Sequence, residues 1–73
     1  MKKHDPSIGY RAYEEVLRLF PSIKQGALVI GCGKNVVYDW HSGMSPTAVY
    51  LARLYELGAD VIYILTGKKN KEG

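Results

Sequence analysis

The chain has 73 residues, 47% of them hydrophobic, and its ten basic and seven acidic residues give a net charge of +3. A chain of this length forms one domain with a thin core that buries roughly 60% of the unfolded surface, and its apolar fraction argues against disorder. One cysteine excludes an internal disulfide, and two scattered histidines supply no metal-ligand set. No apolar run approaches the roughly 20 residues of a membrane span, so we expect a cytoplasmic protein without a cofactor.

The N-terminal segment predicts a mobile basic arm followed by a helix. The arm is either simply solvated or makes a phosphate or minor-groove contact through Lys2 and Lys3. Asp5 and Pro6 are a typical cap and first helical residue, whereas Gly9 should weaken the first turn, so that the regular helix begins nearer residue 8. The spacing i, i+3, i+4, i+7 marks the expected core face, which consists of Tyr13, Val16, Leu17 and Phe20. The expected solvent side carries Arg11, Glu14, Glu15 and Arg18, with Glu14 and Arg18 as an ion pair.

Residues 22–43 predict two short helices joined by a tight turn. Ser22 and Gln25 have the spacing of a capping box. A helical interval places three apolar residues on one face, namely Ile23, Ala27 and Ile30. Gly31 supplies the left-handed conformation that ends a helix, and Gly33 can serve as the N-cap of the next one.

The second of these helices, residues 34–41, has two distinct faces. Val36, Val37 and Trp40 should point inward. The outward set is Asn35, Tyr38, Asp39 and Ser42, with Lys34 one residue earlier. An amide, a phenol, a carboxylate and an amine are groups that can contact base edges in a major groove.

An alternative interpretation makes residues 27–30 a buried strand that enters a phosphate-binding loop. The spacing argues against it, because a phosphate loop needs glycine where Leu28 stands and Ser or Thr where Asn35 stands. A dinucleotide fingerprint also fails, since its third glycine position is Val36.

Two more helices are expected in the C-terminal part. Ser45 should cap the first, with Pro46 at its first position and Met44 packed on Val49. Its expected buried face is Ala48, Leu51, Ala52 and Tyr55, with Tyr50 and Arg53 outside and Gly58 closing the helix.

Asp60 should cap the last helix, residues 61–66. Its expected core residues are Val61, Ile64 and Leu65, which leaves Ile62 and Tyr63 outside, where they either form a dimer contact or overlap the first helix. Residues 68–73 are charged and predict a flexible tail, or the start of a linker to a further domain.

The sequence also resembles a known family. Ala27, Gly31, Val37 and Trp40 match the helix-turn-helix pattern of phage repressors, and residues 56–67, ELGADVIYILTG, resemble the end of the CI-type repressor DNA-binding domain. The resemblance covers about residues 13–67. It implies an all-α, lambda-repressor-like bundle of about five short helices in one domain, residues 1–73. Gly26, inside the first motif helix, departs from the pattern and should cost about 0.5–1 kcal/mol relative to alanine, and Gly33 replaces the usual Ser or Thr.

We therefore expect a sequence-specific DNA-binding regulator that represses by occupying a palindromic operator on double-stranded DNA, as a homodimer. The expected contacts to bases or phosphates are Lys24, Gln25, Lys34, Asn35, Tyr38, Asp39 and Ser42. The alternative is a helical protein-interaction module, adaptor or antitoxin-like, that keeps the fold without binding DNA. No Ser/His/Asp, Cys/His or paired-carboxylate spacing indicates an enzyme, and His41 alone at a helix end is typical of a cation at the negative pole.

Overall fold

The computed structural model describes residues 6–69, and within them it contains five α-helices and no strand. The helices are α1 (Pro6–Leu19), α2 (Ile23–Ile30), α3 (Lys34–His41), α4 (Ala48–Glu56) and α5 (Val61–Thr66). The all-α prediction is confirmed. The predicted basic arm, the Asp5 cap and the last four residues of the tail lie outside the described residues.

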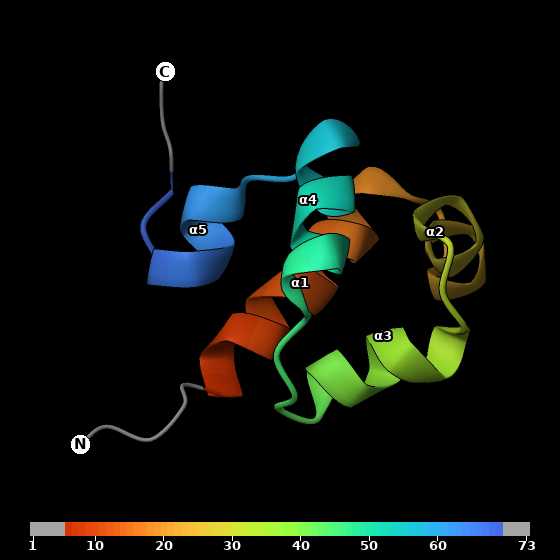
Figure 1. Ribbon diagram of the computed structural model, residues 1–73, viewed down its shortest axis with the longest axis horizontal. Helices are drawn as coiled ribbons and strands as arrows, with labels where there is room; N and C mark the ends of the chain where they lie inside the picture. Colours follow the sequence, from red (N-terminus) through yellow and green to blue (C-terminus); the bar gives the residue numbers. More distant parts are fainter. Residues whose placement is uncertain (1–5, 70–73) are drawn as a thin grey trace.

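α1 is the helix on which the others are assembled. Figure 1 shows α4 crossing in front of α1, with α2 and α3 toward one end of the molecule and α5 at the other. α1 makes its most extensive contacts with α3 and α5. The N-terminal end of α1 and the C-terminal end of α3 lie along the same lower edge in this view.

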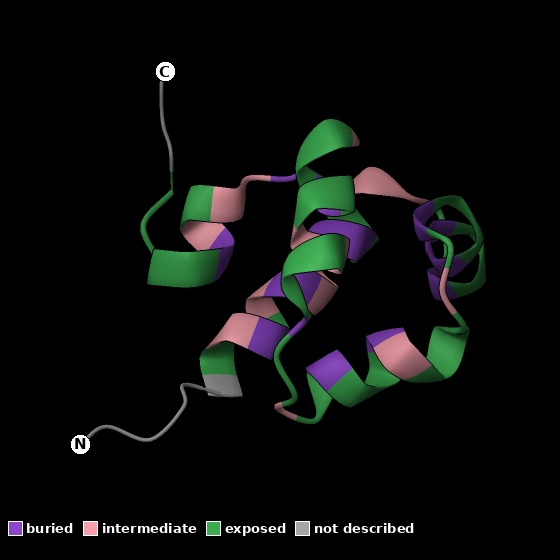
Figure 2. Cartoon of the chain, in the orientation of Figure 1, coloured by how far each residue is buried: buried purple, intermediate pink, exposed green. Residues whose placement is uncertain are grey.

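The core lies where the inner faces of the five helices meet, as the inward-facing buried segments in Figure 2 indicate. Its largest fully enclosed side chains come from every helix, namely Val16, Ile30, Val37, Trp40, Leu54 and Ile64. The predicted inner faces of α2 and α3 are confirmed, because their apolar residues are buried or half-buried. Both helices thus present only their remaining sides to solvent.

The buried face of α1 differs from the prediction. Leu17 is 49% exposed, whereas Ala12 and Val16 are fully buried and Glu15 is only 5% exposed. The prediction for Leu17 and Glu15 is wrong because α1 is covered by α3 on one side and α5 on another, so that its buried surface is wider than one apolar stripe and includes polar residues. Tyr13 is half-buried, as are Leu19 and Phe20.

The polar side chains of α1 bind the segment that carries α5. Arg18 pairs with Glu15, at 2.7 Å between Nη2 and Oε1, and not with Glu14 as predicted. The Glu14 carboxylate instead accepts a hydrogen bond from the hydroxyl of Tyr63 at 2.6 Å. Arg11 donates from Nε to the carbonyl of Ile64 at 2.9 Å. We call Arg11, Glu14, Glu15 and Arg18 the polar stripe of α1.

Two helical glycines permit close packing and do not merely weaken their helices. α1 begins at Pro6, ahead of the predicted start, and contains the buried Gly9. A Cβ at Gly9 would overlap the carbonyl oxygen of Met44 and lie 2.7 Å from that of Trp40. A Cβ at Gly26 would lie 2.6 Å from Cγ1 of Val16. Glycine is therefore required where α1 contacts the end of α3 and the middle of α2.

The start of α4 is displaced from its predicted position. Thr47 is the N-cap, and its Oγ1 accepts a hydrogen bond from the amide of Tyr50 at 3.5 Å, while Pro46 is buried ahead of the helix. The predicted Ser45 cap is therefore wrong: the cap is Thr47, two residues further along the chain. The predicted packing of Met44 on Val49 is not supported either, since each is 60% exposed.

The buried face of α4 also differs from the prediction. Leu54 is fully buried and Tyr50 and Leu51 pack against the core, whereas Tyr55 is 70% exposed. Ala48 and Ala52, predicted to be buried, are exposed as well. A frame error of one residue turns a helical face by about 100°, which accounts for the wrong prediction at these positions.

α5 has the predicted cap and limits. The Asp60 carboxylate accepts a hydrogen bond from the amide of Tyr63 at 2.9 Å. Ile64 is fully buried and Val61 half-buried, but Leu65 is 43% exposed, so its predicted core position is wrong. α5 contacts both α1 and α4, but only Ile64 of its six residues is fully buried.

Candidate nucleic-acid interface

The ends of α2 and the start of α3 are determined by residues close to them in the sequence. The hydroxyl of Ser22 accepts a hydrogen bond from the amide of Gln25 at 3.1 Å, which is one half of the predicted capping box. The other half, a bond from the Gln25 side chain back to the amide of Ser22, is not found within residues 6–69. Gly31 ends α2 with φ of 91°, and its amide donates to the carbonyl of Ala27 at 2.8 Å. Gly33 then caps α3 in an extended conformation. The alternative of a strand over residues 27–30 is excluded, because these residues are helical.

α3 presents the predicted outer face. Val37 and Trp40 are 0% and 2% exposed, so the inner side of the helix is fixed in the core. The opposite side leaves four residues exposed, namely Asn35, Tyr38, Asp39 and Ser42. The side chains of Asn35, Tyr38 and Asp39 make no hydrogen bond within residues 6–69, whereas the Ser42 hydroxyl donates to the carbonyl of Tyr38 at 3.3 Å. Three of the four therefore retain all their donors and acceptors for a partner.

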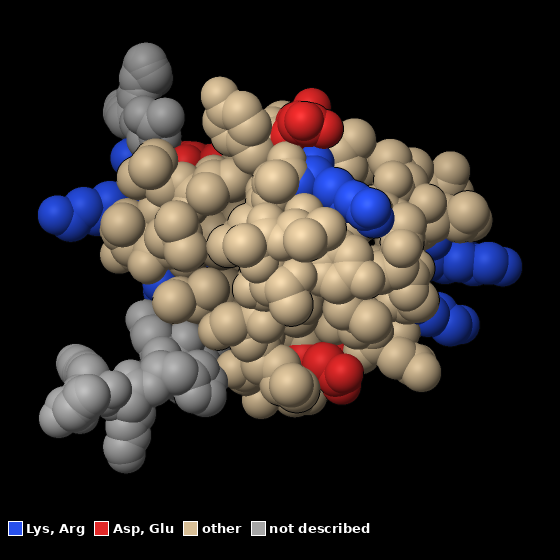
Figure 3. Space-filling model, viewed as in Figure 1, with Lys and Arg blue, Asp and Glu red and all other residues tan. Residues whose placement is uncertain are grey.

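Basic side chains lie beside this face. Lys24 and Gln25 occupy the exposed first turn of α2, and Lys34 begins α3. Lys24 and Lys34 line the same shallow hollow of about 250 Å³. Figure 3 shows basic side chains projecting at the edge of the molecule where α2 and α3 lie. The two lysines and the free amides at the start of α2 form a site of positive potential next to the outer face of α3.

The turn between the helices contains the only thiol of the chain. Cys32 is half-buried and lines the same hollow. Burial raises the pKa of the Cys32 thiol more than the nearby charge of Arg53 lowers it. The thiol therefore stays protonated at neutral pH.

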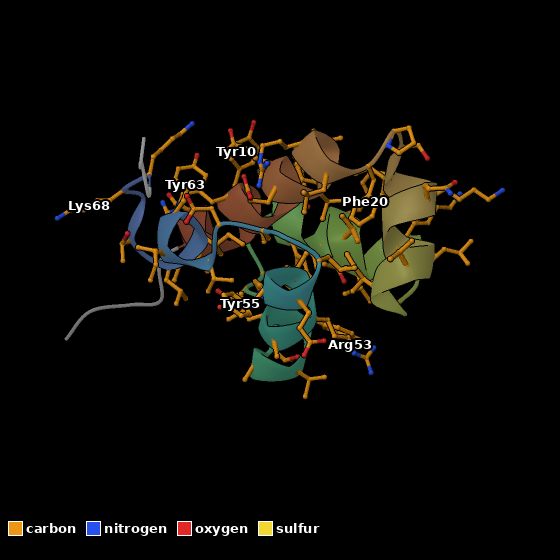
Figure 4. The ribbon with its side chains drawn as sticks, turned by 90° about the horizontal axis from the view of Figure 1, so that it is seen from above. Tyr10, Phe20, Arg53, Tyr55, Tyr63 and Lys68 are labelled. Carbon is orange, nitrogen blue, oxygen red and sulfur yellow. The ribbon has the colours of Figure 1, made fainter. Side chains whose placement is uncertain are left out.

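Arg53 supports the turn from the other side, a role that the sequence analysis missed. Its Nη1 donates to the carbonyl of Ile30 at 2.9 Å, and a Cβ at Gly31 would lie only 2.7 Å from that nitrogen. Its guanidinium lies 5.9 Å from the ring of Tyr50, which in turn is 6.1 Å from the ring of Trp40. Figure 4 shows Arg53 extending from α4 on the side where α2 lies. α4 thus contacts the end of α2 and the buried residue of α3 through one connected set of side chains.

An aromatic cluster at the far end of α3 was also not predicted. The ring of His41 lies 4.6 Å from that of Tyr13 and 5.5 Å from that of Tyr10. Tyr10 is 44% exposed, and His41 is exposed too. The cluster depends on how α1 crosses α3, which no spacing within either helix reveals.

The two residues predicted at a dimer interface differ in their surroundings. Ile62 is 54% exposed. Tyr63 is half-buried, contrary to the prediction that it faces outward: its hydroxyl is bonded to Glu14, and Arg11 and Lys69 lie 6.0 and 5.1 Å from its ring centre. Of these two residues, Ile62 is therefore the more accessible to a second chain.

Neither a metal site nor a membrane-spanning helix is found in the part of the chain that the structure describes. No three His, Cys, Asp or Glu side chains between residues 6 and 69 come together in a way that could hold a metal ion. None of the helices in that range has both the length and the apolar character needed to cross a membrane.

Comparison with known proteins adds no relative from which a role could be transferred. No protein-family model matches the chain, and neither a curated protein nor a solved structure is significantly similar to it. Any functional conclusion therefore depends on the geometry described above.

Proposed function

We propose that the protein is a sequence-specific double-stranded DNA-binding regulator of the phage-repressor type, acting in the cytoplasm by occupying an operator. The observation that carries this proposal is the outer face of α3. Asn35, Tyr38 and Asp39 are exposed and unbonded within the described residues, while Val37 and Trp40 hold the opposite side in the core. A rigid helix with one free polar face is the form that inserts into a major groove.

The side chains of α3 have distinct proposed roles. Asn35 can make two hydrogen bonds to the major-groove edge of an adenine, at N6 and N7, and Lys34 suits guanine or a phosphate. Asp39 can accept a hydrogen bond from a cytosine amine, and otherwise repels phosphates in a wrong register. Tyr38 can contact a phosphate or a thymine methyl group. Ser42, whose hydroxyl is already used within α3, contributes less to base recognition.

The neighbouring positive site would position the helix on the duplex. Lys24 and the free amides of the first turn of α2 meet a phosphate of one strand, with Gln25 beside them. These contacts carry no base information, but they fix the register in which α3 enters the groove.

A dimer would supply the remaining affinity. A single module buries roughly 600–1,000 Å² on DNA, which is usually too little for tight operator binding. A two-fold symmetric dimer that binds half-sites about one helical turn apart would double the surface buried on DNA. Ile62, exposed on α5, is the residue we assign to the contact between chains, with Tyr63 contributing only the part of its ring that remains accessible.

The decisive experiment is selection of bound sites from random duplex DNA, followed by binding measurements on the recovered site. An enriched palindrome would support both DNA recognition and two-fold symmetry. Asn35→Ala should then weaken binding to that site by about 1–3 kcal/mol and relax one base position. Glu56→Ala, an exposed truncation on α4, is the control and should bind like the parent. If Asn35→Ala also binds like the parent, the assignment of α3 is wrong.

The second candidate function is a helical protein-interaction module. The modest net charge of +3 and the carboxylate of Asp39 on the presented face favour it. A salt titration separates the two candidates, because DNA binding through several phosphates falls with a log-log slope of about −0.9 per phosphate. A weak response to salt, together with no enriched DNA site, would favour the protein partner.

A further inference from the structure

We propose that Tyr10 and His41 form a second phosphate-binding site, at the corner where α1 crosses the C-terminal end of α3. This site would bind the DNA strand opposite the one held by Lys24, and its contact would strengthen as the pH falls. The proposal rests on the proposed function, and it adds a regulated contact on a helix that the sequence analysis did not connect with DNA.

The first step is the geometry of the aromatic cluster. The ring of Tyr13 is half-buried and lies 4.6 Å from that of His41, so it supports the imidazole from the core side. Tyr10 lies 5.5 Å from His41 and 6.0 Å from Tyr13, and is 44% exposed. Figure 4 places Tyr10 on the side of α1 away from α4. A hydroxyl and an imidazole are thus held together at the surface.

The second step is the length of α3. Eight residues extend about 12 Å, close to the width of the major groove, also about 12 Å. Lys34 stands at the first residue of the helix and His41 at the last. A helix that lies across the groove brings its two ends near the two backbones. Lys24 and Lys34 then contact one strand of the duplex, and Tyr10 and His41 contact the other.

The third step is the charge that His41 can carry. The rings in contact with that of His41 are Tyr10 and Tyr13 of α1, and His41 itself lies in the last turn of α3. No ion pair joins His41 to a carboxylate within residues 6–69. A protonated imidazole donates from both nitrogens, which suits phosphate oxygens. Protonation therefore adds one positive charge at the corner.

The experiment measures binding of the full chain to a mixed-sequence 20-base-pair duplex, because phosphate contacts do not depend on sequence. Dissociation constants are determined at pH about 7.5 and 5.5 over a range of salt concentrations. Histidine ordinarily changes charge between these values. The parent should bind roughly five- to tenfold tighter at the lower pH, as a charge-assisted hydrogen bond allows. Its log-log salt slope should steepen by about 0.9.

Matched variants show which residue causes the pH response. His41→Gln keeps a hydrogen-bonding side chain and should remove the pH response, whereas His4→Gln, at the other histidine of the chain, should retain it. Tyr10→Phe removes one hydroxyl and should weaken binding about threefold at both pH values while keeping the response. Thermal unfolding of each variant checks that it remains folded at both pH values.

The outcomes separate this inference from the function on which it rests. If the parent binds the duplex but His41→Gln keeps the full pH response, the corner does not bind phosphate, and the assignment of α3 stands. If only the His4→Gln variant loses the response, the titrating contact lies in the first residues of the chain and the inference is wrong. If the parent binds no duplex at either pH, the proposed function fails and the inference with it.

Discussion

α3 and α5 are both short helices packed on α1, but α1 holds them by different kinds of contact. α3 has two large side chains in the core, Val37 and Trp40, and its C-terminal end lies directly against Gly9. α5 has one fully buried side chain, Ile64. The polar stripe adds three hydrogen bonds, to the Ile64 carbonyl, the Asp60 amide and the Tyr63 hydroxyl. One junction is therefore apolar, and the other is mainly polar.

The centre of the polar junction is the carboxylate of Glu15. It accepts hydrogen bonds from Arg18, at 2.7 and 3.1 Å, and from the amide of Asp60 at 2.8 Å. Burial alone raises the pKa of Glu15, but the hydrogen bonds from Arg18 and Asp60 together outweigh it and hold the pKa below its usual value. Arg18 also donates to the carbonyl of Gly58 at 3.1 Å. This carboxylate thus ties α1 to the turn that precedes α5.

Because the two junctions differ in polarity, they should respond differently to pH and to salt. Burial of apolar surface does not depend on a titrating group and responds little to salt, so the position of α3 should be constant over the pH range in which proteins are folded. The attachment of α5 depends on charged groups and should weaken in acid and in high salt. The helix that we assign to base recognition is thus held mainly by apolar contacts, and only the proposed Tyr10–His41 contact at its end should respond to pH.

The largest effect is expected from Gly9→Ala, which tests the apolar junction. Helix propensity alone predicts a gain of up to about 1 kcal/mol. The structure predicts a loss of about 3 kcal/mol in the free energy of unfolding, at the upper end for overpacking, because the added methyl meets backbone oxygens that cannot rotate away. Urea unfolding measures the change. Gly33→Ala is the control: its Cβ meets nothing within 4 Å, and the loss should stay below about 1 kcal/mol. A stabilised Gly9→Ala protein would contradict the close contact of α1 with α3.

An intermediate effect is expected from Glu15→Gln, which tests the polar junction. The amide keeps an acceptor for Asp60 but loses the ion pair with Arg18, so the free energy of unfolding should fall by about 1–2 kcal/mol at neutral pH. Glu56→Gln, at an exposed carboxylate of α4, should change it by less than about 0.5 kcal/mol.

The pH dependence of the parent provides the second measurement at Glu15. Because the pKa of Glu15 is lower in the folded chain, its stabilisation is complete above the unfolded value of about 4.3 and is lost as the pH falls through the folded value. Unfolding curves of parent and Glu15→Gln should therefore converge in acid. A constant difference down to about pH 2 would show that the charge of Glu15 does not contribute.

The smallest effect is expected from Tyr63→Phe. Its hydroxyl donates to Glu14 at 2.6 Å, and this hydrogen bond, with burial second, raises the pKa of Tyr63. Loss of one hydrogen bond to a half-buried group should cost about 0.5–1.5 kcal/mol. Amide hydrogen exchange should become faster in α5 and stay unchanged in α3, whereas Tyr55→Phe, at a 70% exposed ring, should change neither. Equal acceleration in both helices would mean that the two junctions open together.

Most of the candidate interface could be predicted from the sequence, because its signals are local. The limits of α3 and α5 follow from caps within a few residues of each start, at Gly33 and Asp60. The exposed face of α3 follows from helical spacing once those limits are set. The inner faces of α2 and α3 follow in the same way, since each of these helices covers the core with a single apolar side.

The rest depends on contacts between distant segments. Nothing near Gly9 in the sequence shows that the end of α3 will lie against it, and nothing near Glu15 shows that the amide of Asp60 will complete its surroundings. α4 offers two hydroxyl caps two residues apart, Ser45 and Thr47, and nothing near them in the sequence shows that the second is used. Arg53 and the Tyr10–His41 corner were missed for the same reason, since their partners lie on other helices.

Trp40 has a practical consequence. It is the only tryptophan of the chain, is 2% exposed, and belongs to the helix that we assign to the major groove. Its fluorescence emission therefore reports the seating of α3 without any added label, while unfolding confined to α5 would leave the indole enclosed and the spectrum unshifted. A blue-shifted emission maximum that persists in acid while the helical circular dichroism declines would be the optical signature of a molecule that opens at one end first.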